Sequence, residues 1–153
     1  MMGYYLAADL KELPDEEPFR HWVPLLAYFL KDCDTVEIRV WREEADLIAE
    51  MKRSLPTFRF RPEGSEMSAI GPLSEHVVHY LCEDYLAEDE LELLADEKVK
   101  WFTVNLMQGK KNLFHISHNG GDIYVPAVST KEIDFIRSTI PPASSMLIQK
   151  NRK

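Results

Sequence analysis

Cysteine is scarce in this sequence, and its placement excludes a disulfide framework. The 153-residue chain has only two cysteines, Cys33 and Cys82, which are far apart and form no C-x-x-C pair. Small secreted folds that depend on disulfides carry more cysteines, so we expect two free thiols and a reducing, cytoplasmic location. Both cysteines have acidic neighbours. Because negative charge raises the pKa of a thiol, neither is expected to act as a nucleophile.

Long apolar runs are also missing. The longest, Val23 to Leu30, has eight residues and contains a proline, whereas a membrane-spanning helix needs about 20 residues. The segment from Met1 to Leu10 has no basic start and is interrupted by Asp9, so it does not resemble a signal peptide. We therefore expect a chain that does not enter a membrane.

Motifs of familiar catalytic chemistry are absent as well. The sequence contains no G-x-S-x-G elbow, no P-loop and no G-x-G-x-x-G fingerprint. Gly120 and Gly121 fall in a predicted hairpin turn rather than between a strand and a helix, so they are not expected to bind phosphate. These absences lead us to predict no catalytic residue and no cofactor, and they argue against an enzyme.

The residues that are present are typical of a folded globular domain. Apolar residues make up 45% of the chain and charged residues 29%, which are ordinary fractions for such a domain. A chain of this length can bury a sizeable core without disulfides or metals. We expect residues 1–153 to form a single domain.

Alternation and helical spacing divide the chain into short elements. The clearest strand is Thr35–Arg42, in which Val36, Ile38 and Val40 alternate with residues of the opposite face. The segment Ser129–Glu132 is a capping box and opens a helix. The predicted strands are Tyr4–Leu10, Thr35–Arg42, Thr57–Arg61, Trp101–Gln108, Leu113–His118 and Ile123–Val125, with an edge strand at Met146–Gln149. The predicted helices are Pro24–Lys31, Glu43–Leu55, a helix from Pro72, Asp89–Ala95 and Ser129–Ile140.

The order of these elements predicts the fold class. Strand Thr35–Arg42, helix Glu43–Leu55 and strand Thr57–Arg61 follow one another closely, which predicts a parallel pair joined by a right-handed crossover. Residues Pro62 to Gly71 are predicted to form a loop. The expected fold is α+β with a mixed sheet, in the order β-α-β-α-β-α-α-β-β-β-α. The Met146–Gln149 edge would also allow self-association.

Each predicted strand has one apolar face and one largely polar face. Strands buried on both faces would show continuous apolar runs, so we expect helices mainly on one side of the sheet and water on the other. The polar face is predicted to contain Glu37, Arg39, Trp41, Arg59, Arg61, Thr103, Asn105, His115 and Ser117. These side chains are either ordinary solvent-facing strand residues or a binding surface.

As a binding surface, the polar face favours an anionic ligand. Arg39, Arg59, Arg61 and His115 would hold a phosphate or carboxylate of a small metabolite, with Trp41 beside them. A nucleic-acid surface is not indicated, because the net charge is −8 and no run of lysine or arginine supplies phosphate contacts. A small enzyme or ligand-binding domain is therefore the alternative function.

Two groups of histidines have spacings that could suit a metal. His76, His79 and Glu83 share one face of a predicted helix, although any polar helix face has this spacing. His115, His118 and Asp122 are close in sequence, but residues three apart on a strand point to opposite faces unless the strand ends or bulges. We predict no metal site at either place.

The excess negative charge is concentrated in one stretch, from Glu83 to Glu97. The chain has 26 acidic and 18 basic residues. Eight of the acids and no bases lie in this stretch, so the remaining 18 acids and 18 bases balance. The eight acids are Glu83, Asp84, Glu88, Asp89, Glu90, Glu92, Asp96 and Glu97.

Such a stretch is either a solvated helix face or a docking surface. Clustered carboxylates attract basic protein surfaces and speed their encounter. Small acidic inhibitors of basic toxins act in this way, and they offer an analogy at the level of charge alone. The sequence favours a non-enzymatic binding or regulatory protein that docks a basic protein partner through the stretch from Glu83 to Glu97.

Overall fold

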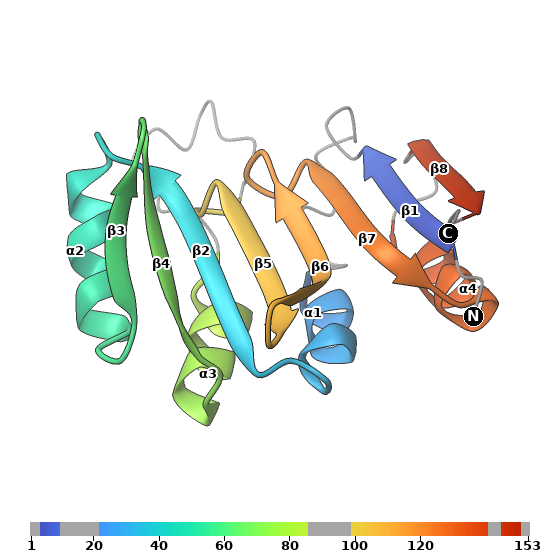
Figure 1. The fold of residues 1–153 in the computed structure, drawn as a ribbon, viewed down its shortest axis with the longest axis horizontal. Coiled ribbons are helices and arrows are strands. Elements are labelled where there is room, and N and C mark those ends of the chain that lie inside the picture. The colour runs from blue at the N-terminus through green and yellow to red at the C-terminus, as the bar shows by residue number, and fades with distance from the viewer. Residues whose placement is uncertain (1–3, 10–21, 86–98, 141–144, 151–153) are drawn as a thin grey trace.

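The computed structural model describes residues 4–9, 22–85, 99–140 and 145–150, which form one antiparallel sheet and four helices (Figure 1). The strands are β1 (Tyr4–Asp9), β2 (Thr35–Trp41), β3 (Arg59–Glu63), β4 (Glu66–Pro72), β5 (Thr103–Gln108), β6 (Lys111–Ser117), β7 (Asp122–Val128) and β8 (Ser145–Lys150). The helices are α1 (Trp22–Leu30), α2 (Ala45–Ser54), α3 (Glu75–Glu83) and α4 (Thr130–Thr139). The α+β class is confirmed.

The strand order in the sheet is β3-β4-β2-β5-β6-β7-β1-β8, and every neighbouring pair is antiparallel. The predicted mixed sheet is therefore wrong. Strands β2 and β3 do run in the same direction on either side of α2, but β4 lies between them and pairs with both. The crossover thus joins two strands that do not share hydrogen bonds.

The predicted loop from Pro62 to Gly71 is also wrong, and with it the predicted element order. Gly64, at a φ of +62°, turns the chain back into β4, so β3 and β4 form a hairpin. The observed order of the described elements is β-α-β-α-β-β-α-β-β-β-α-β. The predicted helix Asp89–Ala95 lies outside the described residues. The capping box is confirmed, because Ser129 and Glu132 exchange both of its hydrogen bonds.

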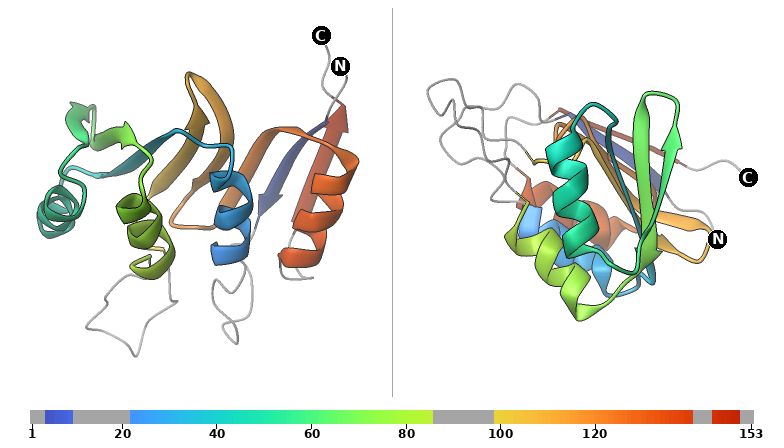
Figure 2. Two further views of the ribbon diagram at one scale, coloured as in Figure 1. Left: turned by 90° about the horizontal axis from the view of Figure 1, so that it is seen from below. Right: turned by 90° about the vertical axis from the view of Figure 1, so that its left-hand side faces the viewer.

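All four helices cover the same side of the sheet (Figure 2). On β2 the helix side consists of Val36, Ile38 and Val40, which are fully buried, and these alternate with half-buried residues on the opposite side. The expectation of helices mainly on one face is confirmed for the described residues. No described helix lies on the other face of the sheet.

The core between sheet and helices is rich in aromatic rings. Trp22 of α1 and Trp101 are almost completely buried, with ring centroids 6.4 Å apart. Phe29 of α1 stacks on Phe114 of β6 at 4.8 Å. None of the described helices is both long and apolar enough to cross a bilayer.

The segment between α2 and β3 packs closely against β4, and this contact leads to a first prediction. A Cβ atom at Gly71 would lie 2.3 Å from Cδ1 of the buried Phe58 ring. We expect Gly71→Ala to lower the free energy of unfolding by about 1–3 kcal/mol, because the ring or the strand must move. Urea denaturation measures the loss. Adding Phe58→Leu should recover part of it, and a fully additive double variant would contradict the packing explanation.

Candidate functional site

The helix-free face carries a continuous row of polar side chains across four strands. The strand register places Glu37 of β2 opposite Asn105 of β5, Asn105 opposite His115 of β6, and His115 opposite Tyr124 of β7. Directly paired residues of antiparallel strands lie on the same face. The structure therefore places Glu37, Asn105 and His115 on one face, as the alternation in the sequence predicted.

The predicted arginine cluster is not brought together with His115. Arg59 and Arg61 are exposed on the edge strand β3, which is four strand spacings from β6 in the sheet order. At about 4.8 Å a spacing, this separation is roughly 19 Å. A small anionic metabolite could therefore not contact these arginines and His115 at the same time.

Arg39 is closer to the centre but is surrounded by carboxylates. It forms ion pairs with Glu63, with Glu66 at 3.4 Å and with Glu37 at 3.9 Å. These acids largely neutralise its charge, which leaves little of it for an anion. The remaining predicted ligand residue, Trp41, packs on Phe102 with ring centroids 4.6 Å apart.

A hydrogen-bonded network occupies the middle of the face. The Glu37 carboxylate accepts from the Ser68 hydroxyl at 2.6 Å and from Asn105 Nδ2 at 3.0 Å. Asn105 Oδ1 lies 3.2 Å from Asn112 Nδ2, which donates to it, and 2.6 Å from His115 Nδ1. Ser68 and Asn105 are buried although they lie on the helix-free side, so this part of the face is drier than the sequence suggested.

A bulge in β6 brings Asn112 into this network. The register between β5 and β6 shifts so that Leu106 pairs with Phe114 and Met107 with Asn112, which leaves Leu113 as the extra residue. Bulges re-aim side chains in this way. Asn112 and His115, three residues apart, consequently face the same side. The alternation that we used at the sequence level could not show this.

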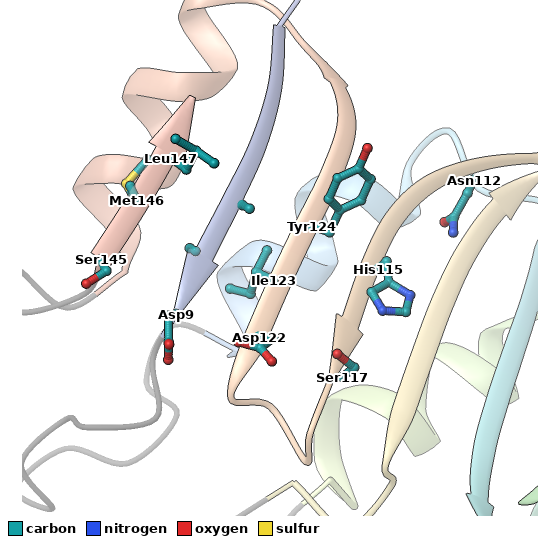
Figure 3. A pocket seen from close by; sticks show the side chains of 12 residues that line it. Asp9, Asn112, His115, Ser117, Asp122, Ile123, Tyr124, Ser145, Met146 and Leu147 are labelled. Atoms are coloured by element: carbon teal, nitrogen blue, oxygen red, sulfur yellow. The ribbon is translucent and has the colours of Figure 1, made fainter. Parts of the chain in front are cut away.

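Beside the network lies a hollow of about 580 Å³ over β6, β7, β1 and β8 (Figure 3). Its volume falls within the range of ligand pockets, about 300–1,000 Å³. Figure 3 shows Asn112, His115 and Ser117 along one wall, facing Tyr124 and Asp122 of β7. The lining residues are Ala7, Ala8, Asp9, Asn112, His115, Ser117, Asp122, Ile123, Tyr124, Ser145, Met146 and Leu147.

The hollow combines acidic and apolar character. Asp9 of β1 lies opposite Asp122 of β7 in the strand register, at one end of the hollow. Among the described residues, no lysine or arginine lines the hollow. Tyr124 and Leu147, which have 40% and 51% of their surface exposed, flank Ala7 on the same face. Sequence reasoning missed most of this lining, because it depends on which strands are neighbours.

Burial lowers the pKa of His115, the histidine in the wall of the hollow. The carboxylates of Glu37 and Asp122 oppose this effect, and His118 adds to it. The net lowering means that the His115 ring is neutral at pH 7.

The two histidine groups have separate partners. His76 Nε2 lies 2.6 Å from the Ser54 carbonyl oxygen, whereas His79 Nδ1 lies 2.7 Å from the Glu83 carboxylate. His118, at a φ of 55° in the β6–β7 turn, pairs with Asp122 at 2.5 Å. Within the described ranges, no three histidine, cysteine or acidic side chains are arranged to hold a metal ion.

Both cysteines are free thiols. Burial raises the pKa of Cys33 and of Cys82, and the neighbouring Asp34 and Glu83 carboxylates raise them further. Thiolate is the reactive form, so neither sulfur is activated.

The structure describes only the N-terminal end of the acidic stretch. Glu83 and Asp84 are exposed at the C-terminal end of α3. The predicted docking residues Glu88, Asp89, Glu90, Glu92, Asp96 and Glu97 lie outside the described residues. The described chain stops at Tyr85 and resumes at Val99. These two ends are held together at a neck, where the Lys100 N–H donates to the Tyr85 carbonyl oxygen at 2.8 Å.

The returning chain is fixed to the turn between β6 and β7. The Val99 N–H donates to the Asn119 carbonyl at 3.2 Å, and Asn119 Nδ2 donates back to the Val99 carbonyl at 3.1 Å. Asn119 is three residues before Asp122, which lines the hollow. The described chain that follows the acidic stretch is therefore anchored to the turn that precedes Asp122.

Comparison with protein-family models, curated proteins and solved structures finds no match to this chain. Its function must therefore be argued from the site itself.

Proposed function

We propose that this chain is a non-enzymatic binding protein that docks a basic protein partner. The contact region would comprise the acidic stretch from Glu83 to Glu97 and the hollow with Asp9 and Asp122. The observation that supports this is the pair of hydrogen bonds between Val99 and Asn119. These bonds join Val99, which follows the acidic stretch in the chain, to the turn that precedes Asp122 of β7.

Charge supports the same partner. Carboxylates clustered in the sequence focus a negative potential, which attracts a basic surface and raises its association rate. The hollow adds exposed apolar surface at Tyr124 and Leu147, and buried apolar contacts with a polar rim are typical of protein interfaces. The anionic-metabolite alternative gains no such support, because Arg39 is paired with carboxylates.

Charge reversal tests the proposal. Glu88, Asp89, Glu90 and Glu92 are changed together to lysine, which moves the net charge from −8 to 0 because each reversal adds 2. Purified basic proteins are passed over the immobilised wild type and variant at increasing salt. We expect the wild type to bind one of them in a salt-sensitive way, and the variant to lose roughly tenfold or more in association rate.

A second variant separates clustered charge from net charge. Asp32, Asp46, Glu75 and Asp134 are exposed and distributed over the helical side of the molecule. Changing these four to lysine also brings the net charge to 0, but it leaves the acidic stretch intact. This control should retain most of the binding. Equal losses in the two variants, or salt-insensitive binding, would contradict the proposal.

A further inference from the structure

The amide of Asn105 has a fixed orientation. Its Nδ2 lies 3.0 Å from Glu37 Oε1, and an ionised carboxylate can only accept hydrogen bonds. The other end of the amide, Oδ1, is therefore the one that faces β6. This assignment follows from the network itself and settles which groups around Asn105 must donate.

The orientation of Asn105 determines the tautomer of His115. Asn105 Oδ1 is an acceptor and lies 2.6 Å from His115 Nδ1, so Nδ1 carries the proton. In a neutral imidazole the other nitrogen, Nε2, then has a free lone pair and accepts a hydrogen bond. The His115 ring stands in the wall of the hollow (Figure 3).

Asn112 helps to hold Asn105 in this orientation. Its Nδ2 donates to Asn105 Oδ1 at 3.2 Å, so its own Oδ1 is turned away from that bond. Among the described residues this buried Oδ1 has no hydrogen-bond partner. Because this atom is itself buried, it offers no acceptor to a ligand in the hollow.

The hollow thus presents acceptors on its polar side. His115 Nε2 lies on β6, and the carboxylates of Asp122 and Asp9 lie on β7 and β1. The exposed ring of Tyr124 lies on β7, two residues from Asp122 (Figure 3). A ligand with several donors, a positive charge and a flat surface that stacks on an aromatic ring matches this lining.

We propose that the hollow receives the guanidinium group of an arginine side chain from the basic partner, with His115 Nε2 as an acceptor beside the Asp122 and Asp9 carboxylates. Guanidinium is planar, has five N–H donors and stacks on aromatic faces, whereas an ammonium is a compact charge without a flat face. The inference rests on the proposed docking of a basic protein and names the side chain that this site would recognise.

This recognition depends on pH. The groups that face His115 are Glu37 from β2, Asn105 from β5, Asp122 and Tyr124 from β7, His118 from the turn, and Asn112 and Ser117 on its own strand. Protonation of His115 turns Nε2 into a donor and adds a positive charge, so arginine should be released. Because the pKa of His115 is lowered, binding persists at neutral pH and is lost on acidification below the ordinary histidine range.

The tautomer can be measured directly in the wild-type protein. Long-range ¹⁵N–¹H NMR distinguishes a protonated from an unprotonated ring nitrogen, and we expect an unprotonated Nε2 at pH 7. Adding N-acetyl-arginine amide should shift the His115 signals, while N-acetyl-lysine amide should shift them less. An Nε2–H tautomer, or His115 signals that do not respond to the arginine probe, would overturn the inference.

Variants separate this inference from the proposed function. We expect His115→Phe to weaken binding of N-acetyl-arginine amide by about tenfold or more, since a hydrogen bond to a charged group is lost. His76→Phe replaces an exposed histidine outside the hollow and should have no effect. Salt-sensitive docking of a basic protein that is unchanged in His115→Phe would refute the arginine site and leave the docking function in place. Arginine-amide binding without any docking of a basic protein would refute the partner assignment.

Discussion

Replacing Trp22 with alanine is expected to remove about 3–5 kcal/mol from the free energy of unfolding. Trp22 is 1% exposed, and its indole N–H donates to the Leu81 carbonyl of α3 at 2.9 Å. Its ring stacks on Tyr85 at 5.7 Å and tilts against Trp101 at 6.4 Å. The substitution would leave a large cavity and a buried carbonyl without its donor. Against a typical total stability of about 5–15 kcal/mol, this loss is severe.

The same substitution should affect the acidic stretch. The Tyr85 ring stacks on Trp22, and the Tyr85 carbonyl oxygen accepts the Lys100 N–H. This hydrogen bond closes the neck between Tyr85 and Val99. We expect Trp22→Ala to increase hydrogen exchange at the Lys100 amide relative to the β5 and β6 amides. Protection of Lys100 that follows the sheet amides would show that the neck does not depend on Trp22.

Denaturant unfolding measures the stability loss, and a second tryptophan provides the control. Trp41 lies on the helix-free face, where it is half-buried and contacts Phe102. Trp41→Ala should cost clearly less than Trp22→Ala, because less of the ring is removed from water in the folded protein. Equal losses for the two variants would mean that the core between α1 and α3 is not the main stabilising contact of this ring.

Sequence patterns predicted the elements whose signals are local. Val36, Ile38 and Val40 alternate because β2 is buried on one side only, and the capping box at Ser129 depends on four consecutive residues. Strand β4 had no comparable signal. Ser68 and Ala69 are neighbours and both are buried, since one faces the polar network and the other faces the helices. A strand with small buried residues on both sides shows no alternation of apolar and polar residues.

The candidate site was predictable only in part, for a related reason. Alternation along each strand assigns residues to faces, and it placed Arg39, Arg59 and His115 on a common face. It gives no information about which strands are neighbours. The insertion of β4 between β3 and β2 moves Arg59 away from His115. The pairing of β1 with β7 and β8 creates the hollow from segments that are more than 100 residues apart in sequence.

Replacing Glu37 with leucine should produce the second large effect, on both stability and recognition. Glu37 accepts hydrogen bonds from Ser68 and Asn105, which are both buried. Leucine is similar in size but cannot accept, so the two donors would lose their partner in a dry environment. We expect a loss of about 2–6 kcal/mol in the free energy of unfolding, because two buried groups become unsatisfied and each costs about 1–3 kcal/mol.

Glu37→Gln is the matched control for the acceptor. Glutamine keeps a carbonyl oxygen that can accept from Asn105 Nδ2, and its amide nitrogen can donate to the Ser68 hydroxyl. The glutamine variant should therefore retain most of the stability that leucine loses. If the two variants were equally destabilised, the negative charge of Glu37, rather than its hydrogen bonds, would be responsible.

The leucine variant should also change His115, two strands away. Without Glu37 the Asn105 amide is free to turn, and its Nδ2 can then face His115 Nδ1. A donor in that position favours the tautomer with the proton on Nε2, which would cancel the acceptor in the hollow. We expect long-range ¹⁵N–¹H NMR to show a protonated Nε2 in Glu37→Leu and an unprotonated Nε2 in Glu37→Gln, with binding of N-acetyl-arginine amide retained only in the latter. An unprotonated Nε2 in both variants would show that Glu37 does not control the ring, and that another group holds the proton on Nδ1.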